Sequence, residues 1–174
     1  MEKAAAKVQK YIPEFWDEEL LKDGGKTSAS NESSLVLYGD FGVGRRVLLT
    51  GDAGIWGWTM AANYADANSL PLQDFMFIQI PHHGSRRNVG PTVLNYVVGP
   101  ILPEDTTPFS AFVSAPKEDD SHPRKMVLNA FIRRGARVLA TQGGKKVFYG
   151  GFPRRSGYGP VDPLPFATEV EGYD

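Results

Sequence analysis

The sequence predicts an α/β fold in which a mixed β-sheet is flanked by helices. Three observations lead to this prediction. Short apolar runs, rich in β-branched residues, alternate along the chain with segments of helical periodicity. Turns rich in Gly and Pro separate these segments. The resulting order is strand, strand, helix, strand, helix, strand, helix, strand, strand, which is typical of a layered α/β protein.

In the N-terminal third, the sequence pattern that predicts helices and strands is weaker than in the rest of the chain. Residues 2–22 are rich in Ala and Lys and predict one or two short helices, interrupted at Pro13. Residues 24–34 are polar and rich in Gly and Ser, which indicates a loop or linker. Apolar runs at 35–38 and 47–50 flank a Gly-rich turn, so we expect a β-hairpin there.

The rest of the chain gives a clearer alternation. It predicts a helix over 55–67, a strand over 75–80, a helix over 91–98, a strand over 111–114, a helix over 122–135 and a terminal strand pair over 136–141 and 145–150. The chain therefore divides into an N-terminal helical segment and linker (1–30), an α/β domain (31–150) and an irregular tail rich in Pro and Gly (151–174).

Composition limits the classes of function. The chain has 174 residues, of which 41% are hydrophobic and 22% charged, as expected for one globular domain. The net charge of −1 gives no overall attraction to nucleic acid or membrane. There is no Cys, which excludes disulfides, thiolate ligands and a Cys nucleophile. No apolar run reaches the roughly 18 residues of a membrane span, so we expect a cytoplasmic protein.

Polar residues follow two of the apolar strands. Asp52 comes after Gly51, and it could bind a cation or, more simply, cap the next helix. His82 and His83 follow strand 75–80, and imidazole is the commonest neutral metal ligand. Adjacent strand residues point to opposite faces, so one histidine can bind a metal while the other packs. Gly84 permits close backbone approach, which favours a site.

A third polar group precedes the helix expected at 122–135. Ser121 and Pro123 suit the start of a helix, and His122 is then incidental. Arg124 and Lys125 are usually solvated charges. Because helix N-termini favour anions, these residues and His122 are also candidates for binding an anionic substrate. Ser85 has no GxSxG context that would make it a nucleophile.

Several of these motifs occur together in one order. They are Asn31 with Ser34, the strand end Leu48–Asp52, the turn His82–Ser85, His122 with Pro123, and Thr141 with Gly143. This combination, over about residues 31–149, resembles the C-terminal half of metallo-β-lactamase-fold hydrolases, in the branch that includes the metallohydrolase domain of the competence protein ComEC.

The resemblance implies a fold and a site. The fold would be half of a four-layer αββα sandwich. Asp52 would be the bridging carboxylate of a two-metal centre, with His82 or His83 as a further ligand and Asp52 and His83 in catalytic roles. Ser85, His122 and Lys125 would contact substrate. The metal would be Zn²⁺, with Mn²⁺ as the alternative, and a metal-activated water would hydrolyse an ester or a phosphodiester, including one in nucleic acid.

One departure from the family shapes the functional hypotheses. The family motif His-x-His-x-Asp-His is absent, and no His precedes residue 82. We therefore expect a hydrolase half that needs a complementary N-terminal half or a second copy of the chain. The alternative is a non-catalytic binding or regulatory module. A third hypothesis is direct nucleic-acid binding through Arg86, Arg87, Arg124, Lys125, Arg133, Arg134, Lys145 and Lys146.

Overall fold

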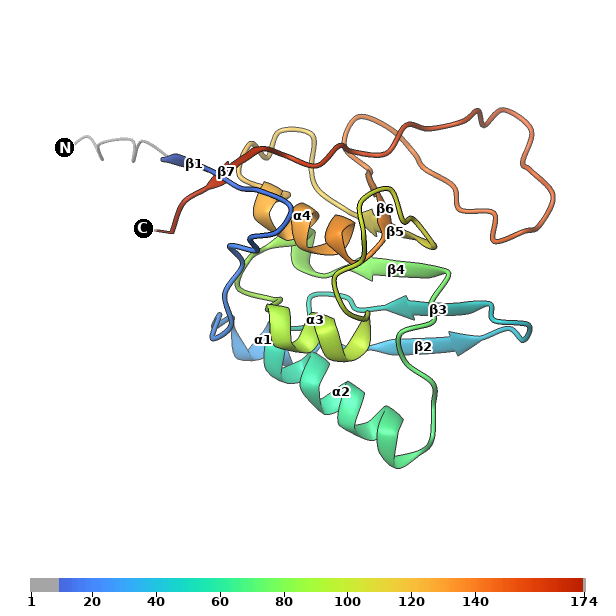
Figure 1. Cartoon of the computed structure of the whole chain (residues 1–174). Helices are drawn as coiled ribbons and strands as arrows, with labels where there is room; N and C mark the ends of the chain where they lie inside the picture. Colours follow the sequence, from blue (N-terminus) through green and yellow to red (C-terminus); the bar gives the residue numbers. More distant parts are fainter. Residues whose placement is uncertain (1–9, 174) are drawn as a thin grey trace.

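The protein is built on a five-stranded mixed sheet (Figure 1). The structure is a computed structural model, and it describes residues 10–173. The strands, in spatial order, are β2 (Leu37–Asp40), β3 (Arg46–Leu49), β4 (Phe77–Ile80), β5 (Phe109–Val113) and β6 (Ala136–Ala140). β2 and β3 form the expected antiparallel hairpin, and β3 to β6 are parallel. The α/β prediction is confirmed.

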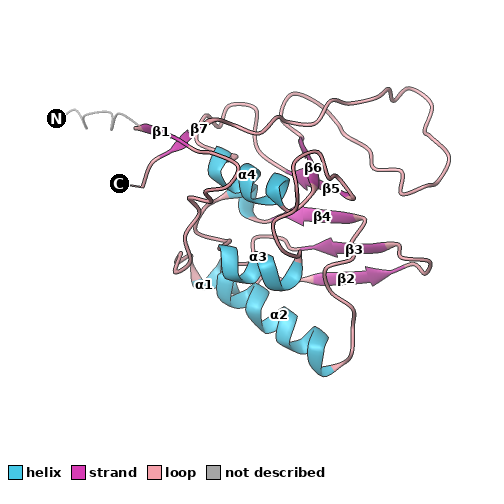
Figure 2. Cartoon of the chain, in the orientation of Figure 1, coloured by secondary structure: helices cyan, strands magenta, loops and turns pink. Residues whose placement is uncertain are grey.

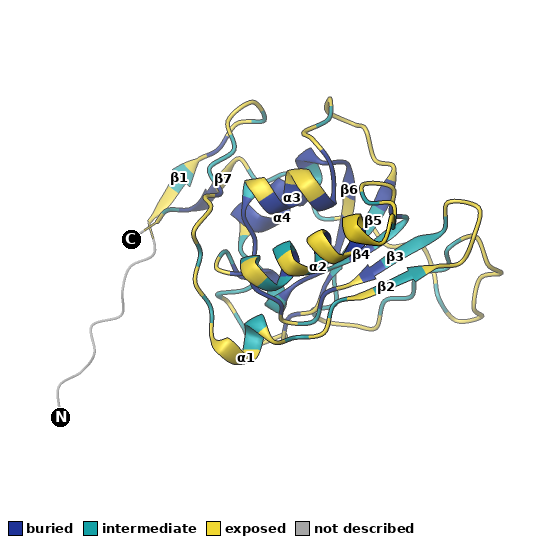
Figure 3. Ribbon diagram, turned by 90° about the horizontal axis from the view of Figure 1, so that it is seen from below, coloured by how far each residue is buried: buried dark blue, intermediate teal, exposed yellow. Residues whose placement is uncertain are grey.

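Three helices join the successive parallel strands. They are α2 (Ile55–Ala67), α3 (Pro91–Val97) and α4 (Lys125–Arg133). Parallel crossovers share one hand, and these strands are ordered in space as they are in sequence. All three helices therefore lie over the same face of the sheet (Figures 2 and 3). In the described part of the chain no helix packs on the opposite face, which we call the helix-free face, and irregular chain after β6 lies against it.

The main core lies between the sheet and these helices. Strand residues alternate in burial, as Phe109, Ala111 and Val113 do along β5. The largest buried apolar side chains of the helices are Trp58, Leu94, Met126 and Phe131. Their removal from water is the main stabilising contribution of this layer.

The N-terminal segment differs from its prediction. Residues 1–9 lie outside the described part of the chain. Within residues 10–22 there is no helix; the strand β1 (Tyr11–Pro13) pairs antiparallel with β7 (Glu169–Glu171). The helix prediction for 10–22 is wrong because tertiary contacts override local propensity. The backbone carbonyls that a helix would use accept hydrogen bonds from α4 instead.

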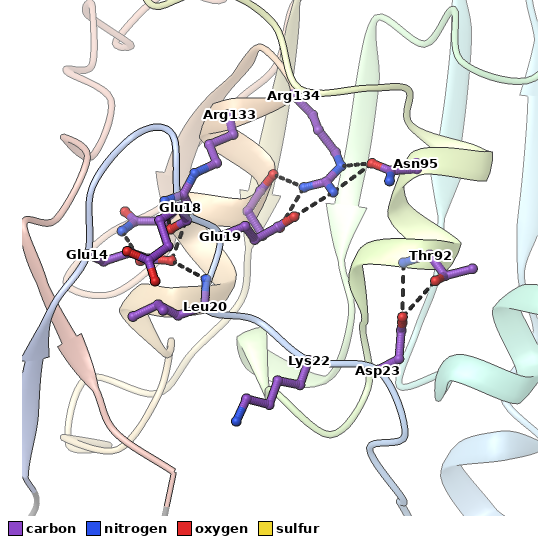
Figure 4. A network of polar contacts seen from close by, with 12 residues as sticks. Glu14, Glu18, Glu19, Leu20, Lys22, Asp23, Thr92, Asn95, Arg133 and Arg134 are labelled. Atoms are coloured by element: carbon purple, nitrogen blue, oxygen red, sulfur yellow. Dashed lines mark hydrogen bonds and ion pairs between the residues drawn. The ribbon is translucent and has the colours of Figure 1, made fainter.

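Two arginines at the end of α4 make these contacts (Figure 4). Arg133 is fully buried, pairs with buried Glu14 at 3.0 Å, and donates to the carbonyls of Phe15, Trp16 and Glu18. We call Arg133, Arg134 and residues 14–19 the arginine clamp. Arg133 and Arg134 are both buried, and their burial corrects the hypothesis that these two arginines bind nucleic acid.

Arg134 completes the clamp on its other side. Its guanidinium forms two bonds to Glu19, at 2.8 and 2.9 Å, and also contacts Asn95 of α3. Planar, two-point pairing of this kind fixes orientation as well as charge. The N-terminal segment is therefore held against both α3 and α4.

Four further predictions need correction. The linker contains one helical turn, α1 (Ala29–Glu32), because the Ser28 side chain caps it by accepting from Asn31. The strand expected at 145–150 is not formed; the Leu164 amide instead donates to Val138 of β6 at 2.8 Å. The tail is irregular except for β7, whose Val170 is fully buried. The predicted helix 122–135 is shorter at both ends, as α4 shows.

Candidate metal site

The carboxyl ends of β3 and β4 bring Asp52 and His82 together. These strands are neighbours and parallel, so the residues that follow them emerge at the same edge of the sheet. His82 Nδ1 lies 3.4 Å from Asp52 Oδ1. The two side chains are partly open to solvent, with 31% of His82 and 50% of Asp52 exposed. The backbone also joins them, since the His82 amide donates to the Gly51 carbonyl at 3.1 Å.

The histidine turn has an unusual backbone. His82, His83 and Gly84 have φ of 40°, 57° and 78°, so three successive residues are left-handed. Such conformations are costly for residues other than Gly and occur preferentially at functional sites. The Ser85 amide, which donates to the His82 carbonyl at 3.0 Å, closes the turn.

The segment just before α4 supports this turn from outside. The Arg124 amide donates to the Gly84 carbonyl at 3.1 Å. A Cβ placed on Gly84 would lie 2.8 Å from Cβ of Pro123, which a cis peptide bond joins to His122. Only glycine therefore fits both the backbone conformation and the space at residue 84.

The loop that carries Asp52 is also held by polar contacts. The Gln79 side chain accepts from the amides of Thr50 and Gly51, at 3.2 and 3.3 Å. Buried Asn88 donates to the Asp52 carbonyl at 2.8 Å. Neither residue was predicted from the sequence to belong to the site. Gln79 carries a signal, as the one polar residue in the apolar run of β4, whereas Asn88 carries none.

Asp52 does not cap the following helix. The N-cap residue of α2 is Gly54, which has no side chain to cap with. The carboxylate of Glu32, from α1, instead accepts from the Gly57 amide at 2.9 Å in the first turn of α2. The capping interpretation of Asp52 is wrong, and its carboxylate remains available at the strand edge.

The two histidines take different directions. His82 faces Asp52, whereas His83 Nδ1 contacts the carbonyl of Ser114, just beyond β5. Their ring centroids are 5.6 Å apart. The left-handed turn, rather than strand alternation, produces this division. Of the two candidate ligands, His82 is the one that shares space with Asp52.

His122 belongs to a separate polar cluster. Its Nδ1 lies 3.0 Å from Asp119 Oδ2 and 3.0 Å from the Ser121 hydroxyl. Hydrogen bonds from the Ser121 hydroxyl and amide, together with His122, hold the pKa of the Asp119 carboxyl well below its usual range. The Gln142 side chain donates to the His122 carbonyl at 3.1 Å.

The other predicted substrate contacts have structural partners. Ser85 is buried, and its hydroxyl accepts from the Arg87 amide at 3.3 Å. The Lys125 amide donates to Glu171 of β7, and its ammonium lies over the Tyr11 ring, 5.0 Å from the centroid. Roles for Ser85, His122 and Lys125 in substrate binding stay predictions.

The site thus consists of one carboxylate and one imidazole at a strand edge. Within residues 10–173, no group of three or more His, Asp or Glu side chains is placed to hold a metal ion.

No helix of this part of the chain is long and apolar enough to cross a membrane. Comparison with protein-family models, with curated proteins and with solved structures finds no match to this chain.

Proposed function

We propose that the chain supplies Asp52 and His82 to the metal centre of a hydrolase of the metallo-β-lactamase superfamily, in its ComEC-like branch. In this proposal the five-stranded sheet and its helices are the distal half of the αββα sandwich. One observation supports it above the others, namely the 3.4 Å separation of Asp52 Oδ1 and His82 Nδ1.

That separation suits two ligands of one ion better than a hydrogen bond. His82 Nδ1 is buried and has no hydrogen-bond partner among the described residues, although Asp52 Oδ1 lies 3.4 Å away. Two donors about 2.0–2.1 Å from a tetrahedral zinc lie about 3.4 Å apart. An unpaired buried nitrogen is costly, and a shared cation would remove that cost.

The donor types fit a borderline cation. A carboxylate oxygen and an imidazole nitrogen suit Zn²⁺, with Mn²⁺ as the alternative. Such an ion, when bound, supplies an acidified water for hydrolysis. Asp52 and His82 would hold it, and the contacts of Gln79, Asn88 and the histidine turn would keep these two ligands oriented.

Two ligands are fewer than the three that a catalytic zinc usually takes from protein. We therefore propose that the remaining ligands come from a complementary αβ half that packs on the helix-free face. That face carries exposed apolar side chains. Leu37 and Leu49, directly paired across β2 and β3, are 50% and 38% exposed. Exposed apolar area of this kind commonly marks an interface.

The second candidate is a binding module without catalysis. The small number of donors favours it, because a site of two ligands binds metal weakly by itself. The two proposals differ over what the Asp52–His82 pair does. In a non-catalytic module these side chains need not bind any ion.

Zinc affinity tests the proposal directly. Wild type, Asp52→Asn, His82→Asn and His83→Asn are titrated with Zn²⁺ against a chromophoric chelator. Asn tolerates left-handed backbone, so both histidine variants keep the turn. We expect Asp52→Asn and His82→Asn to weaken zinc binding at least about tenfold, as loss of one ligand of a shared ion should. His83→Asn should match wild type. Equal affinity in all four proteins would refute the shared site.

A further inference from the structure

A cavity of about 290 Å³ lies on the helix-free face of the sheet. β5 and β6 form its floor, and the irregular chain after β6 forms its walls. The residues that matter to its chemistry are Ser110, Arg137, Lys146, Phe148, Arg154 and Tyr158. No residue of the Asp52 loop or the histidine turn lines it. It is therefore a different site from the candidate metal site.

The charged side chains that line the cavity are all positive. Arg137, Lys146 and Arg154 all line it, and no Asp or Glu does. Among residues 10–173, none of these three cations forms an ion pair. The arrangement contrasts with the arginine clamp, where each guanidinium has a carboxylate partner. Three like charges around one space repel one another, and a bound anion would reverse that repulsion.

Aromatic rings form the apolar part of the cavity. The Phe148 ring packs on Phe77 of β4 and Phe112 of β5, with centroids 4.9 and 6.4 Å apart. These contacts hold the ring against the sheet. Tyr158 lines the cavity from the irregular chain and has no ring partner among the described residues. Planar rings beside cations are suited to a ligand that combines a flat base with a phosphate.

The volume restricts the ligand further. Small-molecule sites typically measure about 300–1,000 Å³, so this one is at the lower limit. We infer that the cavity binds a nucleoside monophosphate, with the phosphate among Arg137, Lys146 and Arg154 and the base against the aromatic wall. This inference does not depend on the proposed metal site, because no residue is shared between them.

The chain offers a matched control for the test. Lys145 and Arg155 are exposed, adjoin Lys146 and Arg154 in sequence, and do not line the cavity. The double variants K146Q/R154Q and K145Q/R155Q therefore lose the same charge, and only the first alters the cavity. Binding of adenosine 5′-monophosphate to wild type and both variants is measured by calorimetry at two salt concentrations. Inorganic phosphate and adenosine serve as separate ligands.

We expect wild type to bind adenosine 5′-monophosphate more tightly than either phosphate or adenosine. K146Q/R154Q should weaken this binding about tenfold or more, since charge-assisted bonds are the strong ones, and K145Q/R155Q should change it less than about twofold. Zinc affinity should be the same in all three proteins. If the double variant does not fold, the single variant R137Q replaces it, because Arg137 is exposed. R137Q should also weaken nucleotide binding.

Three results would overturn the inference. The first is no binding of the nucleotide by wild type at millimolar concentration. The second is an equal loss in both double variants, which would indicate general attraction to a basic surface. The third is binding of inorganic phosphate or adenosine as tight as that of the nucleotide, which would exclude combined recognition of phosphate and base.

Discussion

Gly84 shows how single residues shape the candidate site. Left-handed backbone at His82 and His83 places one imidazole toward Asp52 and the other toward Ser114. Gly84 continues the turn and lies against Pro123. The alternation of side chains along a strand does not apply inside such a turn. For this reason the sequence could predict a histidine ligand at this position and could not choose between His82 and His83.

The cost of a side chain at residue 84 can be measured. Gly84→Ala should lower the free energy of unfolding by about 2–4 kcal/mol, since it adds a clash with Pro123 to a left-handed alanine. Gly143→Ala is the matched control, because Gly143 has φ of 76° and nothing within 4 Å of its added Cβ. It should cost only about 1 kcal/mol. Urea unfolding compares them, and equal losses would show that Pro123 is not a constraint.

The Asp119 carboxyl makes stability depend on pH. Its pKa is lowered by the folded environment, so its stabilisation is present above the unfolded pKa of about 4 and is lost as pH falls through the folded pKa. The difference in unfolding free energy between wild type and Asp119→Asn should therefore shrink below about pH 4. Asp120→Asn, at an exposed neighbour, is the control. A difference that stays constant from pH 7 to pH 2.5 would contradict this account.

The elements show which predictions a single sequence permits. Local periodicity predicts the hairpin, the helix over 55–67 and the strands at 75–80, 111–114 and 136–141. The structure confirms these elements, with small shifts at the strand ends. Asp52 and a histidine lie close together because each follows one of two neighbouring parallel strands, which end at the same edge of the sheet. The N-terminal segment could not be predicted in this way, because residues more than 110 positions away determine its conformation through the arginine clamp.

The arginine clamp gives a prediction at this scale. Glu14→Gln should lower the free energy of unfolding by about 3–5 kcal/mol, because it leaves the Arg133 charge buried without its carboxylate. Glu18→Gln changes an exposed side chain of the same segment and should cost less than about 0.5 kcal/mol. Thermal and urea unfolding of the two variants provide the measurement. A loss for Glu14→Gln as small as that for Glu18→Gln would show that the ion pair does not hold this segment.

Among residues 10–173, the helices that connect the parallel strands all lie on one face of the sheet (Figure 3). Right-handed crossovers between strands in sequential order require this arrangement, and it leaves apolar side chains of β2 and β3 exposed. The cavity lined by positively charged side chains lies on the same face, at β5 and β6. The proposed partner half and the proposed nucleotide therefore use different parts of the helix-free face.

Exposure of that face predicts association. In the absence of a partner, wild type should self-associate with increasing concentration, as seen by sedimentation velocity. The double variant L37Q/L49Q should remain monomeric, with little change in unfolding free energy because both side chains are already partly exposed. Identical sedimentation of the two proteins at all concentrations would show that this pair of residues is not an interface.

The central claim is that Asp52 and His82, and not His83, bind one ion. Nitrogen-15 NMR of the histidine rings during a zinc titration tests it most directly. We predict a large shift of a His82 ring nitrogen, no comparable shift of His83, and a much smaller shift of His82 at the same zinc concentration in Asp52→Asn. Ring nitrogens of His82 that do not respond to zinc in wild type, or that respond equally in Asp52→Asn, would contradict the claim.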